Sequence, residues 1–133
     1  MDRIWDPLRK KFVTATPEER VRQWFVNVLR TSCGVPVTMM RTEAGFRFGR
    51  KRYRADIIVY GRDGSPLCVV ECKQPGVDID ASVAEQAMRY NSVLDVKFLI
   101  LTNGNLTYIY TLEGGTFVPC NHIPSYDEML CRR

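Results

Sequence analysis

The sequence predicts an α/β fold in which a mixed central β-sheet is flanked by α-helices. Two apolar runs rich in β-branched residues, 54–60 and 67–73, surround the turn-forming sequence 61–66 and indicate a β-hairpin. A helical pattern over residues 81–94 follows and leads into a compact apolar strand, residues 97–102. A strand–helix–strand crossover sets its two strands parallel, whereas hairpin strands are antiparallel. The sheet is therefore expected to be mixed.

A first helix is predicted over residues 17–31. Thr16 is placed as its N-cap, Pro17 as its first residue and Glu19 as the N3 residue of a capping box. Apolar residues recur at helical spacing up to Gly34, which ends the pattern. These apolar residues are Val21, Trp24, Phe25, Val28 and Leu29.

The remaining elements are shorter. Gly45 and Gly49 are expected to punctuate a pair of strands that precede the central hairpin, and Asn103-Gly104-Asn105 indicates a turn after the crossover. The length suits one hydrophobic core, so residues 1–133 are expected to form a single domain. Further strands are expected near residues 37–41, 46–48, 106–112 and 116–119, and a final helical turn near residues 126–131.

Composition favours a water-soluble protein. Apolar residues make up 45% of the chain and charged residues 26%, as in ordinary globular domains. No run approaches the roughly 20 apolar residues that span a bilayer, and the first residues lack the apolar core of a secretory signal. The five cysteines are odd in number and show no CxxC spacing, which argues against a disulfide framework or a zinc site. A cytoplasmic location is expected.

The central hairpin predicts a metal site. Side chains alternate along a strand, so Glu71 and Lys73 point the same way. With Tyr60 opposite Leu67, the register places Asp56 opposite Glu71, at a Cβ separation of roughly 4.5–5.5 Å. Two carboxylates this close need a cation between them, which indicates a divalent metal. The alternative is a surface salt bridge between Glu71 and Lys73 or Asp56.

Both helices offer polar side chains toward this cluster. At 100° per residue, Glu18 lies about 60° from Val21 and Glu19 about 160° away. We therefore expect Glu18 to face inward and Glu19 mainly to cap the helix. In the second helix, Gln86 shares the apolar stripe of Tyr90 and needs a polar partner at the sheet end. The alternative for Gln86 is a position at the helix edge, in water.

Positive charge is concentrated in residues 41–54, although the net charge is only +4. Phe46, Phe48 and Tyr53 lie between the basic residues, a composition typical of surfaces that contact phosphates and stack on bases. The alternative is a solvated hairpin whose charges keep an edge strand soluble. The basic residues are Arg41, Arg47, Arg50, Lys51, Arg52 and Arg54, with Glu43 as the one acid.

Three segments resemble motifs of the PD-(D/E)xK nuclease superfamily. They are Arg54-Ala55-Asp56, Glu71-Cys72-Lys73 and Gln86-x-x-x-Tyr90. The chain is most similar to the N-terminal nuclease domain of type I restriction enzyme R subunits, over about residues 16–112. This resemblance implies a restriction-endonuclease-like, three-layer core.

The resemblance also implies roles for individual residues. Asp56 and Glu71 would ligate Mg²⁺ or Mn²⁺, with help from the main-chain carbonyl of Cys72, and Glu18 would bind the metal through water. Lys73 would orient or deprotonate the attacking water. Two residues would support them: Gln86 by holding a phosphate or Lys73, and Tyr90 by bracing the site. DNA would bind to Arg47, Arg50, Lys51, Arg52 and Arg54.

The function that follows is Mg²⁺-dependent hydrolysis of DNA phosphodiester bonds. No GxxxxGK[ST] sequence of a motor is present. The alternative is therefore a non-catalytic DNA-binding or protein-interaction module on the same fold. Expected partners are DNA and either a second copy of the chain or a motor or specificity subunit.

Overall fold

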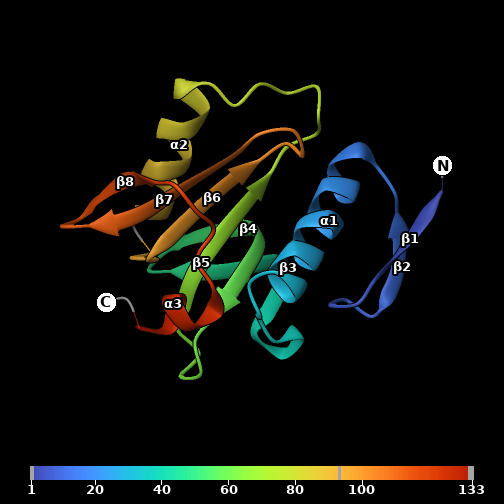
Figure 1. Ribbon diagram of the computed structural model, residues 1–133, viewed down its shortest axis with the longest axis horizontal. Coiled ribbons are helices and arrows are strands. Elements are labelled where there is room, and N and C mark those ends of the chain that lie inside the picture. Colours follow the sequence, from blue (N-terminus) through green and yellow to red (C-terminus); the bar gives the residue numbers. More distant parts are fainter. Residues whose placement is uncertain (1, 93, 132–133) are drawn as a thin grey trace.

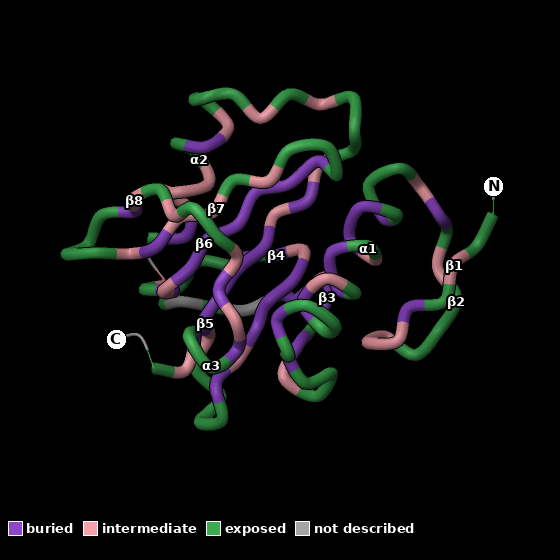
Figure 2. Tube along the Cα trace, viewed as in Figure 1, coloured by how far each residue is buried: buried purple, intermediate pink, exposed green. Residues whose placement is uncertain are grey.

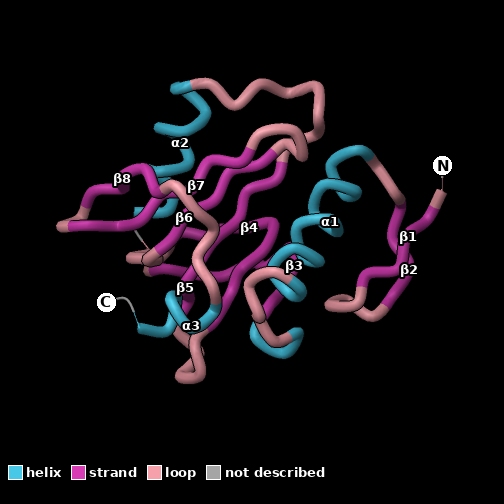
Figure 3. Tube along the Cα trace, viewed as in Figure 1, coloured by secondary structure: helices cyan, strands magenta, loops and turns pink. Residues whose placement is uncertain are grey.

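The computed structural model describes residues 2–92 and 94–131, apart from the side chains of Phe46 and Phe48. A short 3₁₀ helix, Val37–Met39, lies between the first helix and the central sheet. The other elements, shown in Figures 1 and 3, are β1 (Arg3–Asp6), β2 (Lys11–Thr14), α1 (Pro17–Thr31), β3 (Met40–Phe48), β4 (Lys51–Tyr60), β5 (Pro66–Cys72), α2 (Ala81–Ser92), β6 (Phe98–Thr102), β7 (Thr107–Glu113), β8 (Thr116–Cys120) and α3 (Tyr126–Cys131).

Strands β3 to β8 form one mixed sheet in sequential order. β5 and β6, which α2 connects, are parallel, and every other neighbouring pair is antiparallel. The mixed sheet predicted from the crossover is confirmed. β1 and β2 form a separate two-stranded hairpin beside α1 (Figure 1).

The sheet lies between two helical layers. Alternate residues of its inner strands face opposite sides, so each side carries its own apolar cluster. Phe25 of α1 and Met129 of α3 pack on one side, against residues that include Ile57 and Val70. Ala84 of α2 packs on the other side, against Ile58, Val69 and Leu99. Figure 2 shows the inner strands buried, whereas the segment between β5 and α2 is largely exposed.

Two expectations for the segment before the central hairpin were wrong. Gly45 does not separate two strands, because it pairs with Arg54 inside the continuous strand β3. Gly49, the second glycine predicted to punctuate these strands, does lie at a break: its φ of +63° suits the tight turn between β3 and β4. Residues 37–39 form a 3₁₀ turn rather than the start of a strand.

The β1–β2 hairpin was not predicted. Its strands have only four residues each, and polar contacts attach it to the domain together with Leu8, which lies between the strands and packs on the core. Asp6 is fully buried, forms an ion pair with Arg9 and accepts a hydrogen bond from Thr42. The opposite face of the hairpin exposes Trp5 and Phe12, whose rings meet edge to face.

None of the helices in the described part of the chain is long and apolar enough to cross a membrane.

Candidate functional site

Asp56 and Glu71 lie where two neighbouring central strands stop pairing. β4 and β5 are antiparallel, with Ile57 opposite Val70 as the last pair at this end. The same register carried one residue further sets Asp56 against Glu71. The two carboxylates therefore meet at the open end of the strand pair, as the sequence predicted.

The predicted register was wrong at the turn. Tyr60 lies opposite Pro66, not Leu67, because the register shifts between Val59 and Tyr60. The loop closes early, with a hydrogen bond from the Gly61 N–H to the Ser65 carbonyl. Past the irregularity, Val59 faces Cys68, which is the predicted pairing. The error is local and does not displace the two carboxylates.

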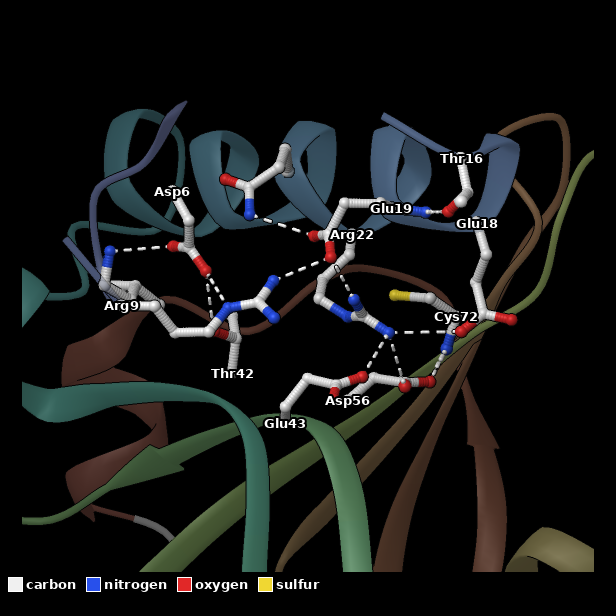
Figure 4. Close-up of polar contacts among 12 residues, drawn as sticks. Asp6, Arg9, Thr16, Glu18, Glu19, Arg22, Thr42, Glu43, Asp56 and Cys72 are labelled. Atoms are coloured by element: carbon white, nitrogen blue, oxygen red, sulfur yellow. Dashed lines mark hydrogen bonds and ion pairs between the residues drawn. The ribbon is translucent and has the colours of Figure 1, made fainter. Parts of the chain in front are cut away.

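The Asp56 carboxylate binds a donor through each oxygen. The Cys72 N–H donates to Oδ2 at 2.6 Å, so a side chain satisfies a backbone group that lies beyond the end of the ladder. Arg22, from α1, donates to Oδ1 at 3.1 Å. One charged and one neutral donor thus hold Asp56 in a fixed position between β4, β5 and α1 (Figure 4).

Glu71 is held close to Asp56. Burial and, next, the charge of Asp56 raise the pKa of Glu71 to about 8, although the charge of Lys73 opposes this. The Lys73 N–H donates to the Thr102 carbonyl at 2.8 Å, which fixes this residue against β6. The structure therefore brings together two carboxylates and an ammonium group, the three charged residues that the hairpin pattern predicted.

A cavity of about 270 Å³ opens between this cluster and α2. Tyr90 lies at its wall, where its hydroxyl accepts a hydrogen bond from the Arg54 N–H at 2.7 Å and its ring packs on Tyr53. Gln86 and Tyr90 both line this cavity, as predicted, but Gln86 is exposed, as in the alternative of a position at the helix edge. The lining includes Arg54, Glu71, Lys73, Gln86, Tyr90 and Asn91.

The predicted roles of the two glutamates in α1 were wrong. Glu18 is exposed, whereas Glu19 is buried. Thr16 caps the helix by accepting from the Glu19 N–H, but the Glu19 carboxylate accepts hydrogen bonds from Arg9 and Arg22 instead of returning to the cap. The helical projection gave the wrong inward-facing glutamate because it took account only of packing on the sheet. Helix α1 also packs against the N-terminal hairpin.

Arg22 is the site residue that sequence reasoning missed. Its side chain is only 4% exposed, and it contacts four carboxylates (Figure 4). Burial lowers the pKa of Arg22, but the charges of Asp56, Glu19 and Glu43, together with hydrogen bonding to Asp56, outweigh it and raise this pKa above its ordinary value. The sequence did contain a signal for this role of Arg22: an arginine beside Val21, on the inward side of an amphipathic helix. The four partners are Glu18, Glu19, Glu43 and Asp56.

The donor set fits a magnesium ion in its chemistry. Mg²⁺ prefers one or two carboxylates and completes its shell with water and phosphate oxygens. Asp56 and Glu71 offer two adjacent carboxylates, and the Cys72 carbonyl follows them in the chain. Among the described residues, no three His, Cys, Asp or Glu side chains are arranged to hold a metal ion. Glu18 binds Arg22 at 3.1 Å, so its predicted contact with metal through water remains a proposal.

The basic segment forms the exposed hairpin of β3 and β4. Arg47 and Arg52 face each other directly across the two strands, an arrangement of like charges that an anion would relieve. Arg54 reaches the cavity and forms an ion pair with Glu43. Tyr53 is buried and therefore does not offer the stacking surface expected of it, whereas the side chains of Phe46 and Phe48 lie outside the described residues. The exposed cations are Arg41, Arg47, Arg50, Lys51, Arg52 and Arg54.

The protein has an α/β fold with paired carboxylates at the open end of two central strands. A match to a family model assigns the chain to a family. Residues 17–124 match the family described as type I restriction enzyme R protein N terminus. The chain belongs to this family. The resemblance to R subunits drawn from the motifs is confirmed at this level.

A solved structure shares the fold. It is a fragment assigned as an HsdR subunit of a type I restriction enzyme from Vibrio vulnificus YJ016, with a TM-score of 0.65 and 23% identity. The similarity covers 86% of this chain but only 24% of that one. No curated protein matches the chain.

Proposed function

We propose that this protein hydrolyses DNA phosphodiester bonds with Mg²⁺, as a member of the PD-(D/E)xK nuclease superfamily. The observation that carries the proposal is the closeness of Asp56 and Glu71, beside Lys73, at the edge of a cavity. Burial and, next, the charge of Asp56 raise the pKa of Glu71. Two such carboxylates are costly to leave without a cation, and they are the ligands that Mg²⁺ prefers.

Each residue of the cluster has a role that its position supports. Asp56 and Glu71 would hold the metal together with the Cys72 carbonyl. A bound Mg²⁺ supplies neutralisation of charge on the scissile phosphate and lowers the pKa of a water. Lys73, on the same strand face as Glu71, would orient or deprotonate the attacking water. Its location at the cavity wall, next to Glu71, supports this role.

Two residues of α2 complete the site. Gln86 is exposed at the cavity wall, where its amide can donate to a phosphate oxygen or accept from Lys73. Tyr90 is braced by its hydrogen bond to the Arg54 N–H and by the Tyr53 ring, so it can fix the distance between β4 and α2.

DNA would approach along the β3–β4 hairpin. Arg54 belongs both to the cavity wall and to this hairpin. A DNA strand whose phosphates bind along the hairpin would therefore reach the two carboxylates at the cavity. Exposed arginines and lysines bind duplex DNA through phosphate neutralisation and counterion release. The remaining contacts would come from Arg47, Arg50, Lys51 and Arg52. DNA as substrate agrees with the cytoplasmic location expected from composition, and the family suggests a motor or specificity subunit, or a second copy, as a further partner.

A second candidate function is a non-catalytic DNA-binding or protein-interaction module. One observation favours it: Arg22 already neutralises part of the acidic centre, so the cluster has a counter-ion without metal. In this case the basic hairpin would bind DNA, and the cluster would only stabilise the fold.

A cleavage assay separates the two candidates. The purified protein would be incubated with linear, nicked and single-stranded DNA in Mg²⁺, Mn²⁺ or EDTA. We expect divalent-dependent cleavage that is lost in Lys73→Ala and retained in Lys97→Ala, a matched lysine change elsewhere in the chain. DNA binding without cleavage in either metal would establish the accessory module.

A further inference from the structure

Arg22 occupies the centre of the acidic cluster in the manner of a bound cation. Its Nη2 lies 3.1 Å from one carboxylate oxygen each of Glu18, Glu43 and Asp56. Its Nη1 lies 2.6 Å from Oε1 of Glu19. The three oxygens around one nitrogen come from α1, β3 and β4, so the guanidinium joins helix α1 to two neighbouring strands of the sheet (Figure 4).

The hydrogen bonding of Arg22 is directed entirely toward these acids. Its Nε is buried and has no hydrogen-bond partner among the described residues. An arginine placed only to fill the core would be expected to satisfy all its donors, because an unpaired buried donor is costly. Here the guanidinium is positioned by the negative charges of the four carboxylates around it.

Its position also conflicts with the proposed metal. Asp56 Oδ1 binds Arg22, and Oδ2 binds the Cys72 N–H. A divalent ion that binds Asp56 must therefore either share a carboxylate oxygen with one of these donors or displace that donor. Two cations bound to one carboxylate repel each other. The repulsion energy is large when the charges are a few ångströms apart in surroundings of low dielectric constant.

We infer that Arg22 is a resident counter-cation that competes with the divalent ion for Asp56 and thereby sets the metal affinity of the site. This inference rests on the proposed function, because it takes Asp56 as a metal ligand. Arg22 is a positioning residue, since it acts through Asp56. It keeps three other carboxylate partners when it yields Asp56, so the metal can enter without expelling the guanidinium from the site.

The N-terminal hairpin restrains this competition. Oε1 of Glu19 accepts from both Arg22, at 2.6 Å, and Arg9, at 2.7 Å. Arg9 is in turn paired with the buried Asp6. Arg22 is therefore anchored on the side away from Asp56, which limits how far it can withdraw.

The test measures metal binding without DNA. Thermal unfolding midpoints and calorimetric affinities would be recorded with Mg²⁺ and Mn²⁺ for the parent, Arg22→Gln and Arg22→Lys. Arg20→Gln is the matched control, because Arg20 lies on the same helix but is exposed and pairs only weakly with Asp2. We expect Arg22→Gln to lower the metal-free midpoint and to bind Mn²⁺ about tenfold more tightly than the parent. Arg22→Lys, which keeps the charge, should fall between them.

A purely structural role predicts something different. Arg22→Gln would then lose stability, but its metal affinity and its metal-induced rise in midpoint would equal those of the parent. That result overturns the inference, as does the absence of metal binding in the parent and in both Arg22 variants. If Arg22→Gln does not fold, an Arg22→Lys protein with parental metal affinity also overturns it.

Two further results separate this inference from the proposed function. Adding Asp56→Asn to Arg22→Gln should abolish the gain in metal affinity, since the competition takes place at Asp56; a gain that persists contradicts the inference. A parent that binds Mn²⁺ more weakly than Arg22→Gln but never cleaves DNA contradicts only the proposed catalysis.

Discussion

The Cys72 N–H donates a 2.6 Å hydrogen bond to Oδ2 of Asp56, across the point where their two strands separate. A side chain from β4 thus takes the place of the ladder acceptor at the end of β5. Asp56 cannot move toward a ligand without disturbing this backbone group. The carboxylate is therefore held in position before any ligand arrives.

Asp56→Ala is expected to weaken both metal binding and folding. The substitution removes a proposed metal ligand and one of the four carboxylate partners of Arg22. It also leaves the Cys72 N–H without its acceptor, at a cost of about 1–3 kcal/mol for an unsatisfied buried group. Calorimetric titration with Mn²⁺ and urea denaturation would measure the two effects. Asp63→Ala, in the exposed loop after β4, is the control. Parental Mn²⁺ affinity in Asp56→Ala would exclude Asp56 as a ligand.

Lys73→Ala should give the opposite result for metal. It removes a positive charge beside the carboxylates, so divalent binding should persist or become tighter while DNA cleavage stops. The same titration and a cleavage assay on one preparation would compare the two quantities. If metal binding and cleavage decline together, Lys73 supports the site and does not act on water.

The pKa of Glu71 predicts a pH dependence of metal-free stability. Because this pKa is raised to about 8 in the folded protein, the folded state retains a proton that the unfolded chain releases near 4.5. The stabilising contribution is therefore complete below pH 4.5 and is lost as the pH rises toward 8. Glu71→Gln cannot ionise, so its stability relative to the parent should increase between pH 5 and pH 8 in EDTA.

Denaturant unfolding at several pH values would check this expectation. Glu85→Gln serves as the control, because Glu85 is exposed on α2. Parallel pH profiles for the parent and Glu71→Gln would show that the folded protein does not raise the pKa of Glu71.

The central carboxylate pair could be predicted from sequence because a strand pair has few degrees of freedom. Alternation and antiparallel register place Asp56 against Glu71, and an irregularity at the turn did not alter this. The contacts of Arg22 and Glu19 could not be obtained in the same way. They depend on how α1 packs against β3, β4 and the N-terminal hairpin, and local periodicity carries no information on such three-dimensional contacts.

The basic hairpin should determine the salt dependence of DNA binding. A variant with Arg50→Ala, Lys51→Ala and Arg52→Ala should bind duplex DNA more weakly. The slope of log affinity against log salt should decrease by about 0.9 for each DNA phosphate that the variant no longer neutralises. Fluorescence anisotropy over a salt series would measure the slope, with Arg30→Ala in the last turn of α1 as the control. An unchanged slope in the triple variant would assign these charges to solubility alone.

The Asp6–Arg9 pair has a consequence for how the protein can be shortened. The family match begins at residue 17, so a boundary chosen from the match would discard both partners of this pair. Glu19 would then lose Arg9, one of the two arginines that share its Oε1, and the remaining one, Arg22, also holds Asp56. Trimming the first sixteen residues, although they lie outside the matched region, would therefore alter the charge balance at the two central strand ends.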